Sequence, residues 1–240
     1  MVAMASALPS MMNLLGGCLI VYWQPIVSES AEHACLTLIR GRRSAENFDA
    51  ARPLDEAQLR ELIEDATHAP SSFNLQHWRF VAVRRAEDKQ RLRAAAYQQR
   101  QVSEAAVTLI LLGDLRATER LAEVLERAVE AGVLAAGKAA AWVRQAAEIY
   151  AEPQAARDEA IRSCSLAAMT LMLAAEARGL KVSPLTGFEP ERVRAEFGIG
   201  ARYLPVMLLC VGHAAPGGES RRLPRLSVEE ILRFDHGDGL

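Results

Sequence analysis

Apolar positions between residues 54 and 70 follow helical spacing. They recur at intervals of three and four residues, which predicts a helix with one buried stripe. The stripe consists of Leu59, Leu62, Ile63 and Ala66. Asp55 precedes it and Gln58 follows three residues later, a capping-box pattern that marks a helix start. Because Pro70 disfavours helical geometry in the residue before it, we expect the helix to end there.

Three runs of aliphatic and aromatic residues predict strands. They span residues 79–83, 106–112 and 203–211, and the second run is closed by Gly113 and Asp114. Each run is short, as strands usually are, and is bounded by polar or turn-forming residues. We expect the three strands to form the middle of one sheet.

Helical spacing returns in three further segments. Residues 118–150 are rich in Ala, Glu, Arg and Leu and are interrupted near Gly132, which predicts two helices with solvated charged faces, forming a cap or a dimer arm. Residues 163–175 carry no charge and are apolar on all sides, which predicts a central helix enclosed by protein and facing a partner subunit. Ser227 and Glu230 repeat the capping-box pattern and predict a short terminal helix.

The first 28 residues have an unusual composition. Residues 2–28 contain no charged side chain, and residues 11–27 are apolar enough to suggest a signal peptide or a membrane span. A basic start is missing, however, and Asn, Gly, Gln and Pro interrupt the apolar run. Residues 15–18 faintly resemble a lipoprotein cleavage site. We favour an extension without assigned function, either non-native or from an upstream start, or an arm packed on a partner subunit.

Length and charge limit the domain count and the partners. The chain of 240 residues, half of them apolar, can bury one sizeable core. We therefore expect an apolar extension over residues 1–30 and one domain over residues 31–240, with a helical insertion at about 117–151. The 28 basic and 30 acidic residues nearly balance, which argues against nucleic acid or an anionic membrane as a partner. Small molecules or a second copy of the chain are favoured instead.

Cysteines and histidines show no site pattern. The four cysteines lie far apart without a C-x-x-C pair, which favours free thiols in a reducing cytoplasm over a disulfide framework. They are Cys18, Cys35, Cys164 and Cys210. The five histidines have no metal-ligand spacing, so we predict no metal site.

Two polar motifs remain once common nucleotide-binding and hydrolase motifs are excluded. The chain has no P-loop and no G-x-S-x-G, and Gly-Ile-Gly at 198–200 lacks the third glycine of a dinucleotide fingerprint. Arg-Arg-Ser at 42–44 offers two guanidinium groups and a hydroxyl to a phosphate, or else forms a solvated basic face. Residues 70–78 present two hydroxyls and two carboxamides before a strand, which match the edge of a pyrimidine-like ring or cap the turn itself.

The order and spacing of these motifs resemble those of the FMN-dependent nitroreductase family. The paired motif is Arg42-Arg43-Ser44-x-x-x-Phe48 followed by Ala69-Pro70-Ser71-Ser72-x-Asn74-x-Gln76-x-Trp78. The resemblance covers roughly residues 32–234 and is greatest to the small bacterial NAD(P)H nitroreductases with the Asn-Leu-Gln-His-Trp form of the loop. Further similar segments are 97–101, 112–115, 165–169, 184–188 and 202–207.

The resemblance implies a fold and an activity. The fold is α+β, a nitroreductase-like three-layer sandwich with a mainly antiparallel sheet flanked by helices. By the same resemblance, two chains would form an intertwined homodimer in which each FMN site is built from both subunits. The activity is hydride transfer from NADH or NADPH by way of FMN to a nitroaromatic, quinone or similar electrophilic small molecule, with ping-pong kinetics in the cytoplasm. Because the flavin carries the chemistry, no catalytic side chain is expected.

The resemblance also assigns roles to residues. Residues 42–44 would contact the phosphate and ribityl chain, and Arg222 or Arg225 would complete the clamp unless both belong to a solvated tail. Residues 71–74 would lie beside the flavin, Gln99 or Gln101 would reach the pyrimidine edge, and the Gly187 N–H would point at N5. The full cofactor-binding set is Arg42, Arg43, Ser44, Glu46, Pro70, Ser71, Ser72, Asn74, Gln99, Gln101, Pro184, Leu185, Thr186, Gly187, Arg222 and Arg225, with Phe73 assigned to the substrate.

Glu46 departs from the family pattern. The family usually places Arg or Lys two positions after the 42–44 motif, where a positive charge stabilises reduced flavin. An ionised carboxylate at the ring would lower the two-electron potential, unless Arg162 or Arg43 takes over the basic role or Glu46 is a surface residue. For Trp78 we expect a core anchor at the start of a strand instead of a site role.

Three alternatives for the function stay open at this point. One is an enzyme of the same fold with a different task on FMN, such as enone reduction, dehalogenation or flavin destruction. Another is a flavin-binding redox sensor without catalysis. The third, a membrane-tethered helical protein, depends only on the apolar composition of the first 28 residues.

Overall fold

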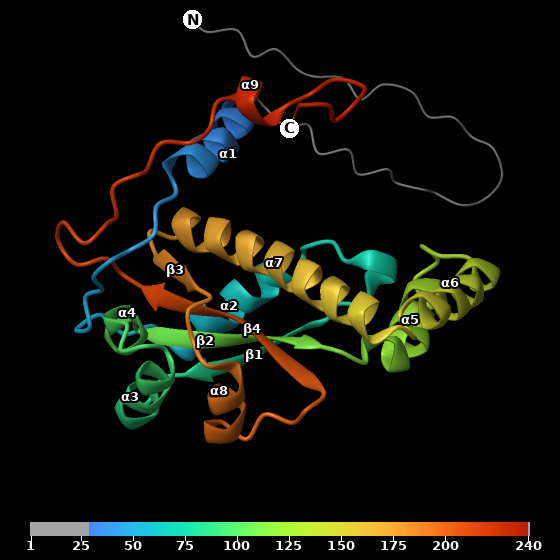
Figure 1. Cartoon of the computed structure of the whole chain (residues 1–240), viewed down its shortest axis with the longest axis horizontal. Helices are drawn as coiled ribbons and strands as arrows, with labels where there is room; N and C mark the ends of the chain where they lie inside the picture. The colour runs from blue at the N-terminus through green and yellow to red at the C-terminus, as the bar shows by residue number, and fades with distance from the viewer. Residues whose placement is uncertain (1–28, 240) are drawn as a thin grey trace, which may run out of the picture. The chain divides into compact units, whose positions relative to one another are not determined.

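The computed structural model describes residues 29–239. The sheet and the pockets discussed below belong to the compact unit Thr37–Leu240, and α1 (Glu29–Gly41) begins before it. Most of the predicted apolar extension lies outside the described residues. The strands of the described part form one antiparallel sheet in the order β1-β2-β4-β3 (Figure 1). They are β1 (Trp78–Val83), β2 (Val107–Asp114), β3 (Lys181–Leu185) and β4 (Tyr203–Gly212).

Only two of the three predicted strands are central. β2 and β4 each have two neighbours, whereas β1 lies at one edge of the sheet, which corrects the expectation that all three predicted strands form its middle. The other edge is β3, a strand that the hydrophobic pattern does not predict. Its Pro184 has no N–H to donate to a ladder, and proline is tolerated in a sheet mainly at such an edge.

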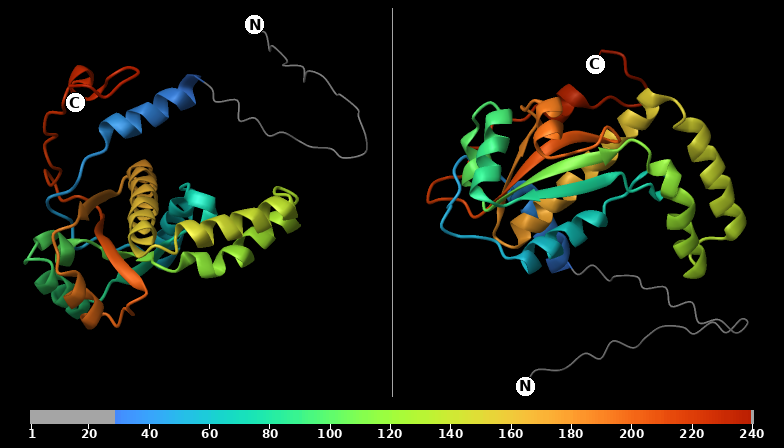
Figure 2. Two further views of the ribbon diagram at one scale, coloured as in Figure 1. Left: turned by 45° about the vertical axis from the view of Figure 1, so that its right-hand side comes forward. Right: turned by 90° about the horizontal axis from the view of Figure 1, so that it is seen from below.

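Side chains of β2 alternate between two apolar layers, and all its residues are buried. Leu109 and Leu111 pack into the layer on one face, and Ile110 and Leu112 pack into the layer on the other. The chain is therefore a three-layer α+β sandwich, as predicted (Figures 1 and 2). The helices are α2 (Glu56–Thr67) and α7 (Pro153–Ala177) on the first face, and α3 (Ala86–Ala95), α4 (Arg100–Glu104) and α8 (Pro190–Glu196) on the second.

Both predicted capping boxes are present. The Asp55 carboxylate accepts the Gln58 N–H at 2.7 Å, and the Gln58 side chain accepts the Asp55 N–H at 3.1 Å. These bonds satisfy backbone donors that the first turn of α2 leaves free. The second box, between Ser227 and Glu230, begins α9 (Val228–Ile231). The predicted core anchor Trp78 is buried at the start of β1.

Residues 117–149, called the insertion below, contain the two predicted helices with a break at Gly132, where φ is 71°. The insertion consists of η2 (Ala117–Arg120), α5 (Leu121–Glu130) and α6 (Ala136–Ile149). It has an apolar core of its own, in which Leu121 and Leu125 of α5 pack with Leu75 from the loop before β1. The insertion is therefore fastened to that loop.

Helix α7 packs across the sheet and extends the predicted helix of residues 163–175 at both ends. It approaches β2 closely at Gly113, where a Cβ atom would lie 2.9 Å from the Cβ of Ala160. The opposite side of α7 stays open, with Leu166 41% and Met169 37% exposed. By length and composition α7 is the one helix among residues 29–239 that could cross a membrane, and buried core helices meet the same criterion.

Two buried cysteines lie on opposite faces of the sheet, Cys164 in the layer of α7 and Cys210 in the layer of α3, α4 and α8. The Cys164 thiol on α7 donates to the Leu112 carbonyl at 3.4 Å, and Cys210 on β4 lies 3.7 Å from the Thr108 hydroxyl. Burial raises the pKa of each thiol to about 12. Both are free thiols, and burial disfavours the nucleophilic thiolate form at neutral pH.

Candidate functional site

The 42–44 motif directly follows α1 and is held against the C-terminal segment. Its neighbour Ala45 is buried and forms an isolated bridge with Glu219. The Ser220 N–H donates to the Ser44 carbonyl at 2.9 Å, and the hydroxyl of Ser183 in β3 donates to the Ala45 carbonyl. These contacts bring three segments that are distant in sequence to one place.

A pocket of about 180 Å³ opens between these segments. No carboxylate lines it, and its lining brings both predicted halves of the clamp together. Arg222 donates to the Arg42 carbonyl at 2.7 Å. The Nη1 atom of Arg42 is buried without a hydrogen-bond partner among the described residues, which is costly unless a ligand supplies an acceptor. The lining residues are Arg42, Arg43, Ser44, Ser220, Arg221, Arg222, Leu223 and Arg225.

Residues 184–187 continue from β3 into an exposed turn that meets the predicted Gln99. The Gln99 carboxamide donates to the Gly187 carbonyl at 2.6 Å and to the Ala96 carbonyl at 3.0 Å. Among the described residues, the Gly187 N–H donates to no acceptor. Gln101 is half-buried in α4 and forms no described hydrogen bond with either residue. The structure therefore joins Gln99, and not Gln101, to the predicted flavin-ring segment.

The loop from Pro70 to Gln76 contains η1 (Ser72–Asn74) and is held by the insertion. The Ser71 hydroxyl accepts the Gln76 N–H at 3.0 Å, and the Ser72 hydroxyl accepts the Tyr150 hydroxyl at 2.8 Å. Phe73, predicted to face the substrate, is half-buried, and its ring packs edge-on against Trp142 and Tyr150.

Three residues of this loop have positive φ angles, 51° at Phe73, 61° at Asn74 and 48° at Gln76. A side chain in the left-handed region costs about 1–2 kcal/mol per residue. Such strain persists only where the surrounding contacts fix it, and it is common at binding sites. Asn74 is exposed, so its carboxamide is free to contact a ligand.

The predicted site residues fall into two groups within one chain. The first group contains the arginine pocket with Gln99 and Gly187, and the second contains the loop of residues 70–76. No hydrogen bond or ion pair among residues 29–239 joins the two groups. Glu46 belongs beside the first group, where its N–H donates to the Gly218 carbonyl at 2.8 Å and its side chain is exposed. Its effect on a flavin stays a prediction.

Asp114 and His77 support the loop, and sequence reasoning assigned neither a role. Arg202 donates to both oxygens of the buried Asp114 carboxylate, at 2.6 and 2.8 Å, and Arg79 lies 3.4 Å away. Burial alone would raise the pKa of Asp114, but the hydrogen bond from Arg202 and the nearby charges hold that pKa below its ordinary value. The one sequence feature that could have indicated this role is the single Asp at the end of an apolar strand.

The imidazole of His77 is fully enclosed. Its Nδ1 lies 2.7 Å from the Asp114 carbonyl, which only accepts, so Nδ1 carries the proton. Burial lowers the pKa of His77, and the hydrogen bond to Asp114 only partly opposes this shift. His77 is therefore neutral at pH 7, and its Nε2 has no partner among the described residues. Within residues 29–239, no three His, Cys, Asp or Glu side chains are grouped so as to hold a metal ion.

Known proteins with similar sequences and structures are numerous. Residues 39–213 match the model of the Nitroreductase family. "Putative NAD(P)H nitroreductase YodC" of Bacillus subtilis is 38% identical over 198 residues, covering 82% of this chain and 98% of that protein. The crystal structure of the "putative nitroreductase ydfN" of B. subtilis has a TM-score of 0.79 at 33% identity, covering 85% of this chain and 99% of that chain. That of a "putative nitroreductase in complex with FMN" from Exiguobacterium sibiricum has a TM-score of 0.78 at 30% identity, covering 83% of this chain and 96% of that chain.

Proposed function

Because the chain belongs to the nitroreductase family, we propose that it is an FMN-dependent oxidoreductase that takes hydride from NADH or NADPH and delivers it to a nitroaromatic, quinone or similar small electrophile. The observation that carries the proposal is the arginine pocket with its buried, unpaired Arg42 Nη1. FMN, when bound, supplies the hydride chemistry. The chain then has to bind it, orient it and leave one face of the ring open.

The arginine pocket fits the phosphate of a mononucleotide. Five arginines and two hydroxyls surround the space, and no acidic side chain lines it to compete with a dianion. A guanidinium group can bind two phosphate oxygens at once, which orients the phosphate as well as neutralising its charge. Arg42, Arg43 and Ser44 would hold the phosphate from one side, and Arg222 and Arg225 from the other.

The turn after β3 fits the flavin ring. Residues 184–187 would lie along the ring, and the Gly187 N–H has no acceptor among the described residues and is free to donate to N5. The Gln99 carboxamide is fixed by two carbonyls through its nitrogen, which leaves its oxygen for a ring N–H. A donor held at N5 favours the hydride-accepting form of the ring without any acid or base side chain.

We further propose that the working form is a homodimer. Within the described residues of one chain, no hydrogen bond or ion pair joins the arginine pocket to the strained 70–76 loop, although the resemblance assigns both to one FMN site. A second copy would supply its loop to the pocket of the first, and the exposed apolar side of α7 offers a surface for the contact.

The kinetics and the compartment follow from the same proposal. If one open face of the flavin serves both substrates in turn, the kinetics are ping-pong. The free thiols Cys35, Cys164 and Cys210 support a reducing compartment such as the cytoplasm.

Absorption spectroscopy tests the flavin assignment. The purified protein, alone or after incubation with FMN and removal of the excess, should show the flavin bands and release FMN on denaturation. Anaerobic addition of NADH or NADPH should bleach those bands. Protein that neither carries nor takes up flavin contradicts the assignment, and flavin that nicotinamide does not bleach supports a binding protein instead of an enzyme.

Removing one guanidinium group tests the phosphate site. Arg42→Ala should raise the Kd for FMN by about one to two decades, because a charged hydrogen bond contributes roughly 1.5–3 kcal/mol. Fluorescence titration of FMN measures this change. Arg40→Ala is the matched control, since Arg40 is an exposed arginine two residues away that does not line the pocket. Equal FMN affinity of the two variants would place the phosphate elsewhere.

A further inference from the structure

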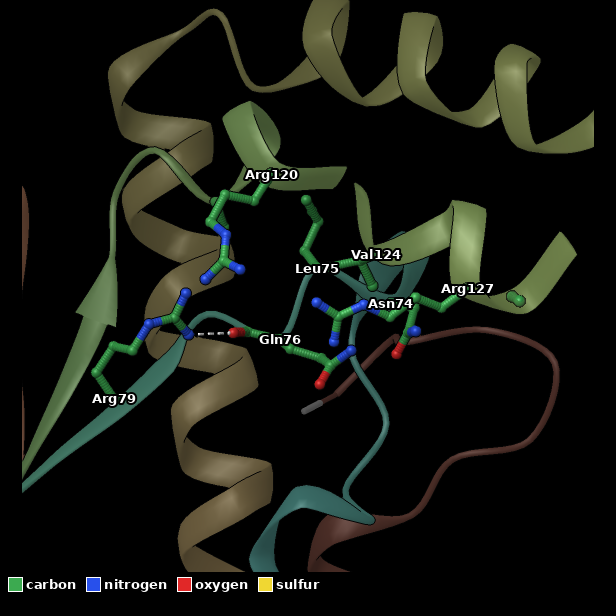
Figure 3. A pocket seen from close by; sticks show the side chains of 9 residues that line it. Asn74, Leu75, Gln76, Arg79, Arg120, Val124 and Arg127 are labelled. Atoms are coloured by element: carbon green, nitrogen blue, oxygen red, sulfur yellow. Dashed lines mark hydrogen bonds between the residues drawn. The ribbon is translucent and has the colours of Figure 1, made fainter. Parts of the chain in front are cut away.

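A second pocket, of about 400 Å³, lies between the insertion and the 70–76 loop. Its size falls in the range of small-molecule sites. Arg79 enters from β1, and Arg120 and Arg127 enter from the insertion. Figure 3 shows their guanidinium groups directed toward the same space, together with the carboxamides of Asn74 and Gln76. Five polar side chains that can donate hydrogen bonds therefore surround one cavity.

The positive charge around this pocket is only partly neutralised. Glu123 is shared by Arg120 at 2.9 Å and Arg127 at 2.6 Å, and it is the only carboxylate that either contacts among the described residues. Arg79 reaches Asp114 at 3.4 Å, but Arg202 already binds both oxygens of that carboxylate. The connected ion pairs comprise Arg79, Arg116, Arg120, Arg127 and Arg202 with Asp114, Glu119 and Glu123. An excess of positive charge remains at the cavity.

The rest of the lining is apolar. Leu75, Ala117, Val124 and Ala128 form an apolar wall, and Val124 and Ala128 lie on the same helix, α5, as Arg127. A fully hydrated inorganic ion gains nothing from such a wall, whereas an organic anion buries its apolar part there. The pocket thus matches a molecule with one anionic end and an apolar or aromatic body.

We propose that this pocket binds the anionic group, a carboxylate or a phosphate, of a substrate whose reactive part lies at the flavin. The proposal rests on the proposed function, because Asn74 belongs both to this lining and to the loop assigned to the flavin. The backbone is left-handed at Asn74 and at Gln76, and the side chains of both polar residues line the pocket. The anion has two sources, the 2′-phosphate of NADPH or a carboxylate on the electron acceptor.

Binding measurements test the pocket directly. Isothermal titration of the purified protein with benzoate, NADP⁺ and NAD⁺ would be compared for wild type, Arg127→Gln and Arg120→Gln. Each variant should weaken benzoate or NADP⁺ by about three- to tenfold, a modest change because these side chains are partly exposed and screened. Arg144→Gln is the matched control, since Arg144 is an exposed arginine on the neighbouring α6 that does not line the pocket.

The pattern of losses separates the two sources. Weaker NADP⁺ with unchanged NAD⁺ assigns the pocket to the 2′-phosphate, and weaker benzoate with unchanged NADP⁺ assigns it to an acceptor carboxylate. In the second case, the KM for 4-nitrobenzoate should rise in the variants while that for its methyl ester stays constant. Unchanged binding in both variants, an equal loss in Arg144→Gln, or no binding of either anion to wild type would overturn the proposal.

Separate measurements test the anion pocket and the proposed oxidoreductase function, so that either can fail alone. Benzoate is neither oxidised nor reduced, so its titration reports on the pocket even in a protein that transfers no hydride. Flavin content and bleaching by NADH report on the oxidoreductase function, and neither depends on a 2′-phosphate. Normal bleaching with unchanged anion binding in the variants would overturn only the pocket assignment.

Discussion

Single side chains around β1 show how the 70–76 loop is held in place. The Asp114 carboxylate binds Arg202 and approaches Arg79, and its backbone carbonyl accepts the His77 proton. Arg79 in turn donates to the Gln76 carbonyl at 2.9 Å. The strained loop therefore depends on one buried carboxylate and one neutral imidazole at its base.

His77 should make stability depend on pH. Burial lowers its pKa from 6.5, despite the opposing effects of Asp114 and Glu159, so the unfolded chain binds a proton more readily than the folded one. The stabilising contribution is complete above about pH 6.5 and is lost as pH falls toward the folded pKa. Over that window the free energy of unfolding should decrease by up to about 1.4 kcal/mol per pH unit for this one proton.

Urea denaturation between pH 5 and 7.5 measures this slope, and His77→Gln should reduce it. Glutamine keeps a donor for the Asp114 carbonyl but has no proton to gain. His68→Gln, at an exposed position at the end of α2, serves as the control and should keep the wild-type slope. An identical slope in His77→Gln and wild type would show that His77 does not control the pH dependence.

The sequence predicted which residues lie together where a local motif indicates the kind of ligand. It did not predict contacts that depend on tertiary packing. The arginines at 42–43 and at 222 were predicted together, and the structure places them in one pocket. Phe73 was assigned to a substrate, but its ring packs on Trp142 and Tyr150, which are about seventy residues away in sequence. No local pattern encodes that contact. The assignment of Phe73 to the substrate stays a prediction.

The helices that the sequence pattern predicted and the two central strands are present, whereas α3, α4, α8 and the edges of the sheet were not predicted. The capping boxes of α2 and α9 fixed two helix starts, because cap residues satisfy local backbone donors. β3 was missed because Lys-Val-Ser-Pro-Leu is short, lacks alternation and contains proline. Its register against β4 is a long-range property of the sheet. The edge position of β1 was not predicted for the same reason, because it depends on which distant strands pair.

The contact between α7 and β2 depends on the absence of a side chain at Gly113. A Cβ there would lie 2.9 Å from the Cβ of Ala160 and 3.4 Å from the Val206 side chain, so helix and sheet would have to separate. Gly113→Ala should lower the free energy of unfolding by about 1–3 kcal/mol, a typical cost of overpacking a core. Thermal or urea denaturation measures it.

The matched control for this substitution is Gly137→Ala in α6. An added Cβ at Gly137 meets nothing within 4 Å, and alanine favours helix, so this variant should gain about 0.5–1 kcal/mol. Opposite signs for the two Gly→Ala variants would establish the steric cause. A neutral Gly113→Ala would show that α7 can shift on the sheet without loss.

At the scale of the whole molecule, the exposed apolar side of α7 predicts assembly. Leu166→Glu should shift the protein from twice the 26.2 kDa chain mass to the monomer mass in light scattering, because a charge cannot be buried there unpaired. If two chains build each FMN site, bound flavin should fall with the dimer. Ile149→Glu is the control, since Ile149 is an equally exposed apolar residue on α6.

Light scattering and flavin content together decide the outcome. A wild-type protein that is monomeric at micromolar concentration and still loaded with FMN would contradict the composite site. Loss of the dimer with full retention of flavin in Leu166→Glu would separate assembly from cofactor binding.

The high pKa of the two buried thiols has a consequence if the proposed electrophilic substrates are the right ones. Quinones and similar compounds alkylate thiolates, and at pH 7 a thiol with a pKa of about 12 is ionised in only about one molecule in 10⁵. Cys164 and Cys210 are therefore shielded twice, by exclusion of the reagent and by suppression of the reactive anion. Cys35, which is exposed, is the described cysteine at which Michael adducts and covalent labels should accumulate.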